Sequence, residues 1–371
     1  MTEQFHAVKT GVIGAGAISE AYLNNLCGDM KEFINVKSIS ASHIENAKKK
    51  ADKYGIEAHT TEEILNDPEI EMVIILTPVD THYGLIKDAL NKGKHVYTEK
   101  TITVNTAQAK ELIELSESKG LYLGSAPDTF LGSSLETVKK AIDEGMIGEV
   151  NSFSISISRN NDILTSMFPF LRREGAGILR DYVVYYLTCL CALLGPAEKA
   201  AAFLKTPYPK RVCILPDSKE FGQEIETPNE AILTGILKLK NGITGTIHDD
   251  SETCIMDRAD FVIYGTKGML LAGCANNFGD PVRFVKAVPA DFTKPEEPEI
   301  LEPVNPYSTN CRGLGAAEMA KAVREGVKNR ASAKLALHVL DIIEAIERSA
   351  ASLQFETIES AAEIPDLFTS L

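Results

Sequence analysis

The sequence lacks any concentration of positive charge and any long apolar run. Lysine and arginine together number 38 against 52 aspartates and glutamates, which gives a formal net charge of -14 at pH 7. Negative charge of this size repels phosphate backbones and anionic lipid headgroups. No stretch approaches the length that spans a bilayer, and the N-terminus has no basic segment followed by an apolar core. We therefore expect no nucleic-acid or membrane partner and a cytoplasmic location.

Cysteine is also scarce and scattered. Seven cysteines in 371 residues are an odd number at wide spacing, unlike the disulfide framework of a small secreted domain. Cys189 and Cys191 stand in an apolar run without a second pair of ligands nearby. We expect reduced thiols and no metal site.

The composition provides enough apolar material for two cores. Hydrophobic residues make up 44% and charged residues 24%, which is ordinary for a globular protein, and 371 residues exceed what one core usually supports. Residues 1–127 alternate short apolar runs with helical patterns, which predicts a Rossmann domain with a doubly wound parallel sheet. Residues 128–371 are richer in alternating strands joined by NG and KG turns. They predict an α+β domain with a large open, mainly antiparallel sheet that binds substrate and mediates oligomerisation.

Three segments of the second half differ from the strand-rich remainder in composition and periodicity. Residues 177–194 and about 314–353 predict apolar helices, the second with Ala, Met, Val and Leu on one stripe. Residues 281–306 are acidic and proline-rich, which indicates a long surface loop or an extended sheet edge.

A glycine-containing turn follows the first predicted strand, in the segment GVIGAGAIS at residues 11–19. Gly14 permits the tight turn, and Gly16 lets the backbone approach a pyrophosphate, which the helix opening at Ala17 and Ile18 would hold by its N-terminus. Ser19 stands where a third glycine is common, is small enough for close helix packing, and has a hydroxyl that could donate to a phosphate. The position near the N-terminus, between a strand and a helix, favours nucleotide binding over a plain strand–helix turn.

The second strand ends in Ser40, Ala41, Ser42 and His43. An acidic residue normally binds the adenosine ribose at this point, and none is present. Ser42 and His43 would tolerate a phosphate there, so NADP is an alternative to NAD.

The next strand runs into TPVDTH, at residues 77–82. Doubly wound sheets place their ligands at such strand ends. We expect Thr77 and Pro78 to line the nicotinamide ribose, and His82 to make a cofactor-side or structural contact.

These segments, with GKHVYTEKT at residues 93–101, SAPDTFLGSSLETVKKAIDEGMIGEV at 125–150 and GAGILRDYVVYYLTCLCALLG at 175–195, resemble the Gfo/Idh/MocA oxidoreductases. The resemblance extends into the C-terminal helix and covers nearly the whole chain. It implies an NAD-dependent enzyme, with NADP as the alternative cofactor. It also implies hydride exchange between nicotinamide and a hydroxyl-bearing carbon, usually of a sugar, cyclitol or glycoside.

Two family motifs are altered here. The family's EKP motif places its lysine beside the reacting hydroxyl and matches Glu99, Lys100 and Thr101, so only the proline is lost. The family's DxGxH motif matches the segment from Asp181 to Tyr185, where tyrosine replaces histidine. This departure resembles a subgroup of the family that carries tyrosines at this point.

Alcohol oxidation needs a base for the hydroxyl proton and a cation for the developing alkoxide. Lys100 can be the cation, and an ammonium nearby favours the phenolate of Tyr185, which can then act as the base. Asp181, four residues earlier, would orient substrate or Lys100. Alternatively, Lys100 is itself the base if burial lowers its pKa.

For each of these residues, a purely structural role is the alternative to a catalytic one. Lys100 can be a surface lysine and Tyr185 a core aromatic. The carboxylate of Asp181 can be held in an ion pair, for which the sequence offers Arg172, Arg173 and Arg180. Asp128 and Thr129, at the domain junction, are candidates for contact with substrate or nicotinamide, and a structural turn fits them equally well.

Two other functions remain open at this point. Transient oxidation by a tightly held NAD would acidify a neighbouring carbon and permit elimination of a glycosidic bond, which makes a lyase or glycosidase. Loss of chemistry, suggested by the altered motifs, would leave a nucleotide-binding sensor. An exposed open sheet commonly needs a cover, so we expect a homodimer or homotetramer through the C-terminal sheet.

Overall fold

The computed structural model describes residues 6–287, 297–368 and 371. The chain divides into two compact units. The first unit comprises Met1–Gly132, Thr309–Leu340 and Phe368–Leu371, and the second comprises Ser133–Ser308 and Asp341–Leu367. Each unit is therefore assembled from segments that are distant in sequence.

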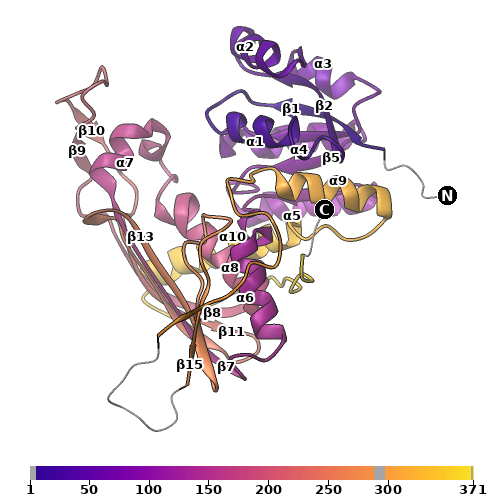
Figure 1. Ribbon diagram of the computed structural model, residues 1–371. Coiled ribbons are helices and arrows are strands. Elements are labelled where there is room, and N and C mark those ends of the chain that lie inside the picture. The colour runs from indigo at the N-terminus through magenta and orange to yellow at the C-terminus, as the bar shows by residue number, and fades with distance from the viewer. Residues whose placement is uncertain (1–5, 288–296, 369–370) are drawn as a thin grey trace. The chain divides into compact units, whose positions relative to one another are not determined.

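The first unit contains a six-stranded sheet with the order β3-β2-β1-β4-β5-β6, in which all neighbouring strands are parallel (Figure 1). Its strands are β1 (Val8–Ile13), β2 (Ile34–Ser40), β3 (Glu57–Ala58), β4 (Met72–Ile75), β5 (His95–Thr98) and β6 (Leu123–Ser125). Every residue of β4 is buried, as expected for a central strand covered by helices on both faces.

Helices alternate with these strands, as the doubly wound pattern predicts. They are α1 (Ser19–Leu26), α2 (Ile44–Tyr54), α3 (Thr61–Asn66), η1 (Val79–Thr81), α4 (His82–Asn91), α5 (Thr106–Ser118), η2 (Thr129–Leu131), α9 (Leu314–Glu325) and the first turns of α10 (Ala333–Ser352). Local sequence fixes several ends: Thr60 and Glu63 form a capping box on α3, and Asn105 caps α5. Apolar stripes from α3, α4, α5 and α10 pack on the strands to form the core.

The second unit is built on a nine-stranded sheet with the order β16-β15-β14-β13-β7-β12-β11-β8-β17. Its strands are β7 (Val150–Asn160), β8 (Ala197–Lys205), β11 (Ile232–Leu239), β12 (Thr244–Asp250), β13 (Glu252–Gly265), β14 (Gly268–Leu271), β15 (Arg283–Lys286), β16 (Glu299–Ile300) and β17 (Glu356–Thr357). Within the described residues, neighbouring strands of this sheet are antiparallel except β7 and β12, which are parallel. A separate hairpin pairs β9 (Lys210–Val212) with β10 (Glu224–Glu226).

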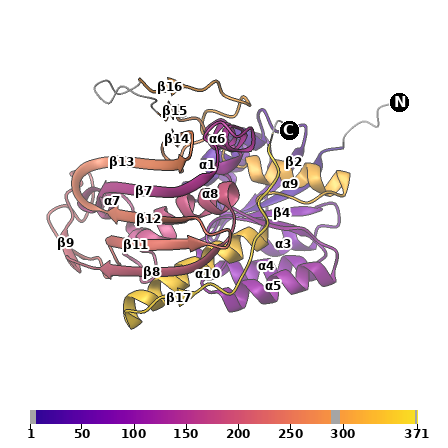
Figure 2. The same ribbon diagram turned by 90° about the horizontal axis from the view of Figure 1, so that it is seen from below.

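Helices cover one face of this sheet (Figure 2). They are α6 (Ser133–Asp143), α7 (Asn161–Met167), η3 (Pro169–Arg172), the π-helix η4 (Leu179–Val183), α8 (Val184–Leu194) and the later turns of α10. All residues of α8 are buried, and β11 alternates between buried and exposed residues. The pattern fits a strand with one face on the core and one in solvent.

The predicted fold class is confirmed: a parallel Rossmann sheet and a large, mainly antiparallel open sheet. The predicted helix over 177–194 corresponds to η4 and α8. The prediction of a single helix over 314–353 is wrong. Helix α9 ends at Glu325 and is followed by Gly326, whose φ of 69° is typical of the residue after a helix C-terminus, and α10 begins separately at Ala333. Within 281–306, β15 and β16 form the edge of the sheet, which confirms the extended edge; residues 288–296 lie outside the described part.

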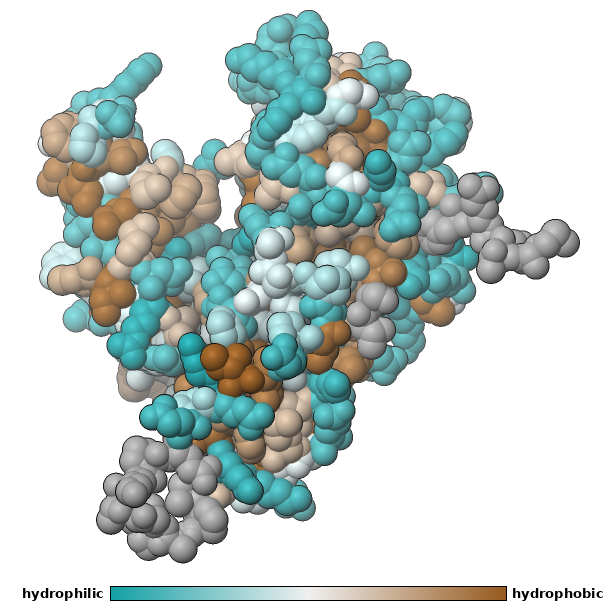
Figure 3. Space-filling view, viewed as in Figure 1, coloured by the Kyte–Doolittle hydropathy of each residue, from teal (hydrophilic) through white to brown (hydrophobic). Residues whose placement is uncertain are grey.

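Exposed apolar side chains gather on the second unit around α7, η3 and the β9–β10 hairpin (Figure 3). They include Met167, Phe168, Phe170, Tyr208, Val212 and Phe221. Such gatherings are typical of contact surfaces. Within the described residues, no helix is long and apolar enough to cross a membrane.

Candidate active-site residues in the two units

The turn after β1 has the geometry of a phosphate-binding turn. The backbone N–H of Gly14 donates to the carbonyl of Ser40 over 2.9 Å, and Gly14 adopts a φ of 114°. A Cβ at Gly14 would lie 2.8 Å from the carbonyl carbon of Leu76. A Cβ at Gly16 would meet nothing within 4 Å, so the backbone there faces open space. The turn therefore requires glycine at position 14 for its own packing and leaves position 16 open to a ligand.

Helix α1 begins directly after this turn. Its N-cap residue is Ile18, which makes no side-chain capping bond, so the N-terminus is not closed by a side chain of its own. Ser19 is buried and its hydroxyl donates to the carbonyl of Gly16 over 2.7 Å. The hydroxyl of Ser19 thus braces the turn, in place of the phosphate contact that the sequence allowed. An open backbone at Gly16 and an uncapped helix N-terminus fit a dinucleotide pyrophosphate.

The end of β2 carries no carboxylate. Ser40 is buried and its hydroxyl lies 3.0 Å from that of Thr61, whereas Ser42 and His43 are exposed. Because residue 41 is alanine, no carboxylate at this position would repel a phosphate on the ribose. Both NAD and NADP are therefore compatible with this end of β2.

His82 is fully buried at the start of α4. One ring nitrogen lies 2.8 Å from the carbonyl oxygen of Thr77, and the other lies 2.8 Å from the carbonyl oxygen of Thr101. Burial lowers the pKa of His82, and the two carbonyls oppose that shift. The ring therefore ties the end of β4 to the segment after β5, which is the structural contact that the sequence offered as one alternative. Thr77 is partly buried and Pro78 is exposed beside it.

Glu99 and Lys100 directly follow β5, and both are partly buried. The phenol of Tyr22 donates to Glu99 Oε1 over 2.8 Å, and the backbone N–H of Lys100 donates to Glu99 Oε2 over 3.0 Å. The peptide bond between Lys100 and Thr101 is cis. Glu99 is thus a support for the main chain that carries Lys100. The contact from Tyr22, 77 residues away, is one that the sequence reading missed and that no local signal marks.

Asp128 is buried, and its Oδ2 accepts hydrogen bonds of 3.0 Å from the backbone N–H groups of Gly313 and Gly315. Burial raises the pKa of Asp128 to about 6. The carboxylate caps the N-terminus of α9, so the structural alternative for Asp128 has direct support. Thr129 is fully buried next to it. Their contact with substrate remains a sequence-based prediction.

In the second unit, Asp181 lies in η4 and pairs with Arg159 at the end of β7. Arg159 Nη1 is 3.3 Å from Asp181 Oδ2, and both side chains are largely buried. The ion-pair alternative for Asp181 therefore has direct support, with a partner that the sequence analysis did not offer; Arg180 pairs with Glu347 and Arg172 with Glu220. Arg159 was missed because it is separated from Asp181 by 22 residues and comes from another element.

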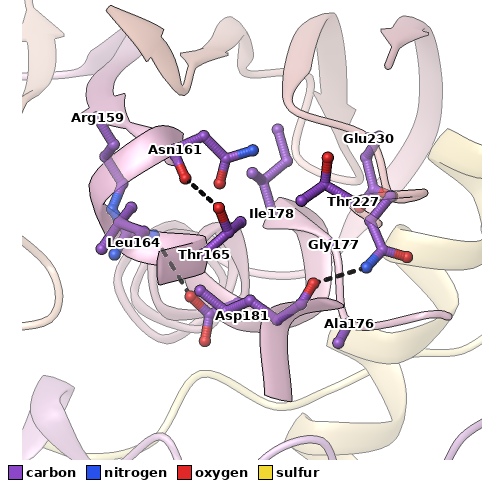
Figure 4. Close-up of a pocket in the computed structure, with 12 residues that line it drawn as sticks. Arg159, Asn161, Leu164, Thr165, Ala176, Gly177, Ile178, Asp181, Thr227 and Glu230 are labelled. Atoms are coloured by element: carbon purple, nitrogen blue, oxygen red, sulfur yellow. Dashed lines mark hydrogen bonds and ion pairs between the residues drawn. The ribbon is translucent and has the colours of Figure 1, made fainter. Parts of the chain in front are cut away.

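A small pocket opens beside Asp181, lined by residues of β7, α7 and the segment before η4 (Figure 4). Its lining is mostly polar and includes Arg159, Asn161, Thr165, Asn229 and Glu230. Its volume of about 20 Å³ is room for roughly one water molecule. This pocket by itself is too small for a sugar.

Tyr185 is nearly buried, with 9% of its surface exposed, and its ring lies 6.3 Å from that of Tyr182. The ring of Tyr182 is also stacked under the guanidinium of Arg159 at 3.8 Å. Burial raises the pKa values of Tyr182 and Tyr186 well above the ordinary range, so these two phenols stay protonated. The structure brings Tyr185 together with Tyr182, and Tyr182 with Arg159. Lys100 belongs to the other unit, so its pairing with Asp181 or Tyr185 stays a prediction.

Asp249 is a buried carboxylate that the sequence reading missed. It lies on β12 with no exposed surface, and Ser251 Oγ donates to its Oδ1 over 2.8 Å. Burial raises the pKa of Asp249 to about 7, and the charge of Arg159 partly offsets this shift. No sequence signal distinguishes Asp249 from Asp250, which follows it on the other face of the strand.

No group of three or more His, Cys, Asp or Glu side chains within the described residues is arranged to hold a metal ion. The seven cysteines are free thiols.

The parallel sheet and its phosphate-binding turn define a dinucleotide-binding protein of the Rossmann class. Comparisons with known proteins agree. Residues 8–126 match the model of the oxidoreductase family with an NAD-binding Rossmann fold, and residues 135–271 match the GFO/IDH/MocA C-terminal domain. Together the two matches span more than two thirds of the chain. The chain belongs to the Gfo/Idh/MocA oxidoreductase family.

Individual relatives are distant but cover almost the full length. The chain is 25% identical over 353 residues to scyllo-inositol 2-dehydrogenase (NADP(+)) IolW of Bacillus subtilis, covering 92% of this chain and 93% of that protein. It is 25% identical over 354 residues to trans-1,2-dihydrobenzene-1,2-diol dehydrogenase of Macaca fascicularis, covering 92% and 97%. A solved structure of levoglucosan dehydrogenase with NADH and levoglucosan has the same fold, with a TM-score of 0.82 at 20% identity over 96% of this chain and 100% of that one.

Membership of this family makes the chain an NAD(P)-dependent oxidoreductase that acts on CH–OH groups. The predicted enzyme class and cofactor are thereby confirmed.

Proposed function

We propose that the enzyme transfers hydride between NAD and a hydroxyl-bearing carbon of a sugar, cyclitol or glycoside. The observation that carries the proposal is the common edge of the parallel sheet. Strand β4 pairs with β1 on one side and β5 on the other. The carboxyl end of β1 continues into the glycine turn, that of β4 leads to Thr77, and that of β5 leads to Lys100. Parallel strands end at the same edge, so the phosphate-binding turn and the family's lysine follow two strands, β1 and β5, that flank β4.

The residues proposed to hold the cofactor are those at these strand ends: Gly14, Gly16, Ala17, Ile18, Ser42, Thr77, Pro78, His82, Glu99 and Lys100. His82 and Glu99 would act by holding the main chain of Thr77 and Lys100, as their hydrogen bonds indicate. The nicotinamide supplies the acceptor or donor of hydride when it is bound. We propose NAD as the cofactor, with NADP as the alternative that Ser42 and His43 permit.

Three side chains are proposed to act on substrate. Lys100 would stabilise the alkoxide that develops as hydride leaves, and Tyr185 would take the hydroxyl proton. Asp181, held by Arg159, would orient the substrate or Lys100. Lys100 as the direct base is the alternative assignment. Asp128 and Thr129 complete the proposed substrate contacts. We also propose that residues 1–127 form the cofactor-binding part and residues 128–371 the substrate-binding part.

The substrate class rests on the relatives. One is named as an inositol dehydrogenase and another as a diol dehydrogenase, and a protein of the same fold is named for its action on levoglucosan. Each of these compounds carries neighbouring hydroxyl-bearing carbons. The 3-hydroxyl of a glucoside is one such target, proposed by analogy.

The test is the nicotinamide absorbance of purified protein at a concentration equal to the cofactor, with NAD and then NADP, on adding sugars, cyclitols and glycosides. A stoichiometric reduction by one class of polyol supports the proposal and identifies the substrate class. No reduction across the panel, with nucleotide binding established by calorimetry, would contradict it. Product formed without net reduction would instead indicate internal redox or elimination, the lyase or glycosidase alternative.

We further propose a homodimer or homotetramer through the open face of the nine-stranded sheet. That face has no helix over it among the described elements (Figure 1), and it exposes Phe203, Ile236 and Tyr264 on three strands. Phe203, on β8 near one edge of the sheet, is 67% exposed. Light scattering tests the proposal, and a monomer at working concentration would contradict it.

A further inference from the structure

The buried face of the nine-stranded sheet carries two charged side chains on neighbouring strands. Strands β7 and β12 run parallel, and Asp249 of β12 is paired with Ile157 of β7. Residues two apart on a strand point to the same face, and Ile157 and Arg159 are both buried, like Asp249. Asp249 and Arg159 are therefore diagonal neighbours on the face that packs against the core.

Each of these two side chains has a polar atom that its bonded partner does not use. Arg159 Nη1 pairs with Asp181 Oδ2 at 3.3 Å, and Ser251 Oγ donates to Asp249 Oδ1 over 2.8 Å. Arg159 Nε and Asp249 Oδ2 are both buried, and neither has a hydrogen-bond partner within the described residues. A cationic donor and an acceptor that can become negative are thus left on adjacent strands, away from water.

Asp249 changes its charge close to neutral pH. Burial raises its pKa from 3.8 to about 7, although the hydrogen bond from Ser251 and the positive charge of Arg159 oppose the rise. Charged groups act on Asp249 from β7, from η4 and from its own strand: Arg159, Asp181 and Asp250, respectively. Leu233, which is paired with Asp249 on the other side, in β11, is apolar. At about pH 7 the protein therefore contains Asp249 in both its neutral and its ionised form.

Arg159 acts on two carboxyl groups with one positive charge. While Asp249 is neutral, the guanidinium pairs with Asp181 alone. Once Asp249 is ionised, it attracts the same guanidinium and repels the carboxylate of Asp181, with little screening by water. The guanidinium is stacked on the ring of Tyr182 at 3.8 Å, which limits how far it can turn to serve both carboxyl groups. Ionisation of Asp249 therefore weakens the contact between Arg159 and Asp181.

We propose that Asp249 is a positioning residue for Asp181: while neutral it lets Arg159 hold the Asp181 carboxylate in place for substrate, and once ionised it loosens that hold. Asp249 has no exposed surface, so it acts through Arg159 and does not contact substrate itself. The inference rests on the proposed function, because it presupposes that Asp181 orients the substrate. Substrate binding then weakens as pH rises and Asp249 loses its proton, and by linkage bound substrate favours the neutral form of Asp249.

The first test is the pH dependence of steady-state kinetics, with the full-length protein, saturating nicotinamide cofactor and the better of myo-inositol and D-glucose as substrate. From about pH 6 to about pH 8.5, KM of the wild type should rise about fivefold, which is a typical size for the weakening of one ion pair. The midpoint should lie at about 7. The rate constant kcat should not share this midpoint, because Asp249 exchanges no proton with substrate.

Variants show whether Asp249 is the group that titrates. Asp249→Asn should keep KM at its low value across this range, because an amide has the shape of the carboxyl group and does not ionise. Asp260→Asn, which neutralises an exposed carboxylate on β13, is the matched control and should keep the wild-type pH dependence. A purely structural role would lower the stability of Asp249→Asn and leave the pH dependence of KM in place. A wild-type KM that does not change with pH, or an unchanged pH dependence in Asp249→Asn, would overturn the proposal.

Infrared spectroscopy tests the coupling of charges without turnover. The C=O stretch of neutral Asp249 is obtained as the difference between each protein and its own Asp249→Asn counterpart, followed from about pH 5 to about pH 9. Relative to wild type, the midpoint should fall in Asp181→Asn, which removes a repelling carboxylate, and rise in Arg159→Met, which removes the cation. Identical midpoints in the three proteins would overturn the proposal.

The two tests distinguish this inference from the proposed function. Shifted infrared midpoints without nicotinamide reduction by either substrate would count against the proposed function alone and support the coupling of Asp249 to Asp181. Nicotinamide reduction with identical midpoints would support the proposed function and overturn the positioning role of Asp249.

Discussion

The two units build their functional surfaces by different means. The first uses main-chain conformation: a glycine turn, an uncapped helix N-terminus and the ends of adjacent parallel strands. The side chains around it, such as His82 and Asp128, are buried and bind backbone groups. The second unit uses side chains that bind one another, with Arg159 between Asp181 and Tyr182. Binding of the dinucleotide thus depends on local backbone geometry, whereas the polar cluster of the second unit depends on contacts distant in sequence.

The variant with the largest expected effect, Lys100→Met, tests whether the first unit takes part in catalysis as well as in cofactor binding. Lys100→Met should lower the rate of hydride transfer about a thousandfold, because it removes a cation from the reacting hydroxyl. Nucleotide affinity, measured by calorimetry, should be nearly unchanged. Lys92→Met, an exposed lysine in the same unit, is the control. Full activity of Lys100→Met would show that the catalytic assignment is wrong.

The next effect concerns the buried carboxylate of the second unit. The pKa of Asp249 rises from 3.8 to about 7 on folding, so the folded state holds a proton there that the unfolded state releases. The contribution of Asp249 to the free energy of unfolding is therefore largest below about pH 4 and declines until about pH 7, by at most about 4 kcal/mol. Asp249→Asn should remove this decline, so denaturant unfolding should show the variant gaining stability relative to wild type as pH rises.

Asp250→Asn, a change on the other face of the same strand, serves as the comparison. A constant difference between wild type and Asp249→Asn across this pH range would show that Asp249 titrates normally in the folded protein.

A pair of glycine variants separates packing from ligand binding within the first unit. Gly14→Ala forces a Cβ against the main chain of Leu76 at a φ of 114°, so it should lower the free energy of unfolding by about 2 kcal/mol and abolish nucleotide binding. Gly16→Ala places its Cβ in open space, so it should leave the melting temperature unchanged and still weaken nucleotide binding. Thermal melting and nucleotide titration distinguish the two. Unaltered nucleotide affinity in Gly16→Ala would remove the turn from the binding site.

The smallest effects are expected from variants of one helix cap in each unit. Thr60 caps α3 and Asn160 caps α7, so Thr60→Ala and Asn160→Ala should each cost about 1 kcal/mol of stability. Helix α7 lines the pocket at Asp181, and α3 carries no proposed functional residue. Asn160→Ala should therefore also raise KM, while Thr60→Ala should leave the kinetics unchanged. An equal KM in both variants would indicate that α7 does not shape the substrate site.

The sequence predicted the first unit well because its signals are local. The tight turn predicted at Gly14 is confirmed by its φ of 114°, and the apolar runs became the parallel strands. The helix over 314–353 was predicted as one because its apolar stripe continues past Gly326, and the sequence pattern does not reveal that this glycine adopts a helix-ending conformation. Arg159 was not among the expected partners of Asp181 because proximity along the chain was the only available criterion, and Arg159 comes from β7.

By itself, the sequence determined the order of strands and helices, the fold class and the phosphate-binding turn, because hydrophobic periodicity and glycine conformations act over a few residues. The tertiary structure decided which polar side chains support the main chain and which bind one another. Burial lowers the pKa of His82 and raises the pKa values of Asp128 and Asp249, and it surrounds the ion pair between Arg159 and Asp181. Burial is a property of the packed chain, since the neighbours that exclude water come from segments far apart in the sequence.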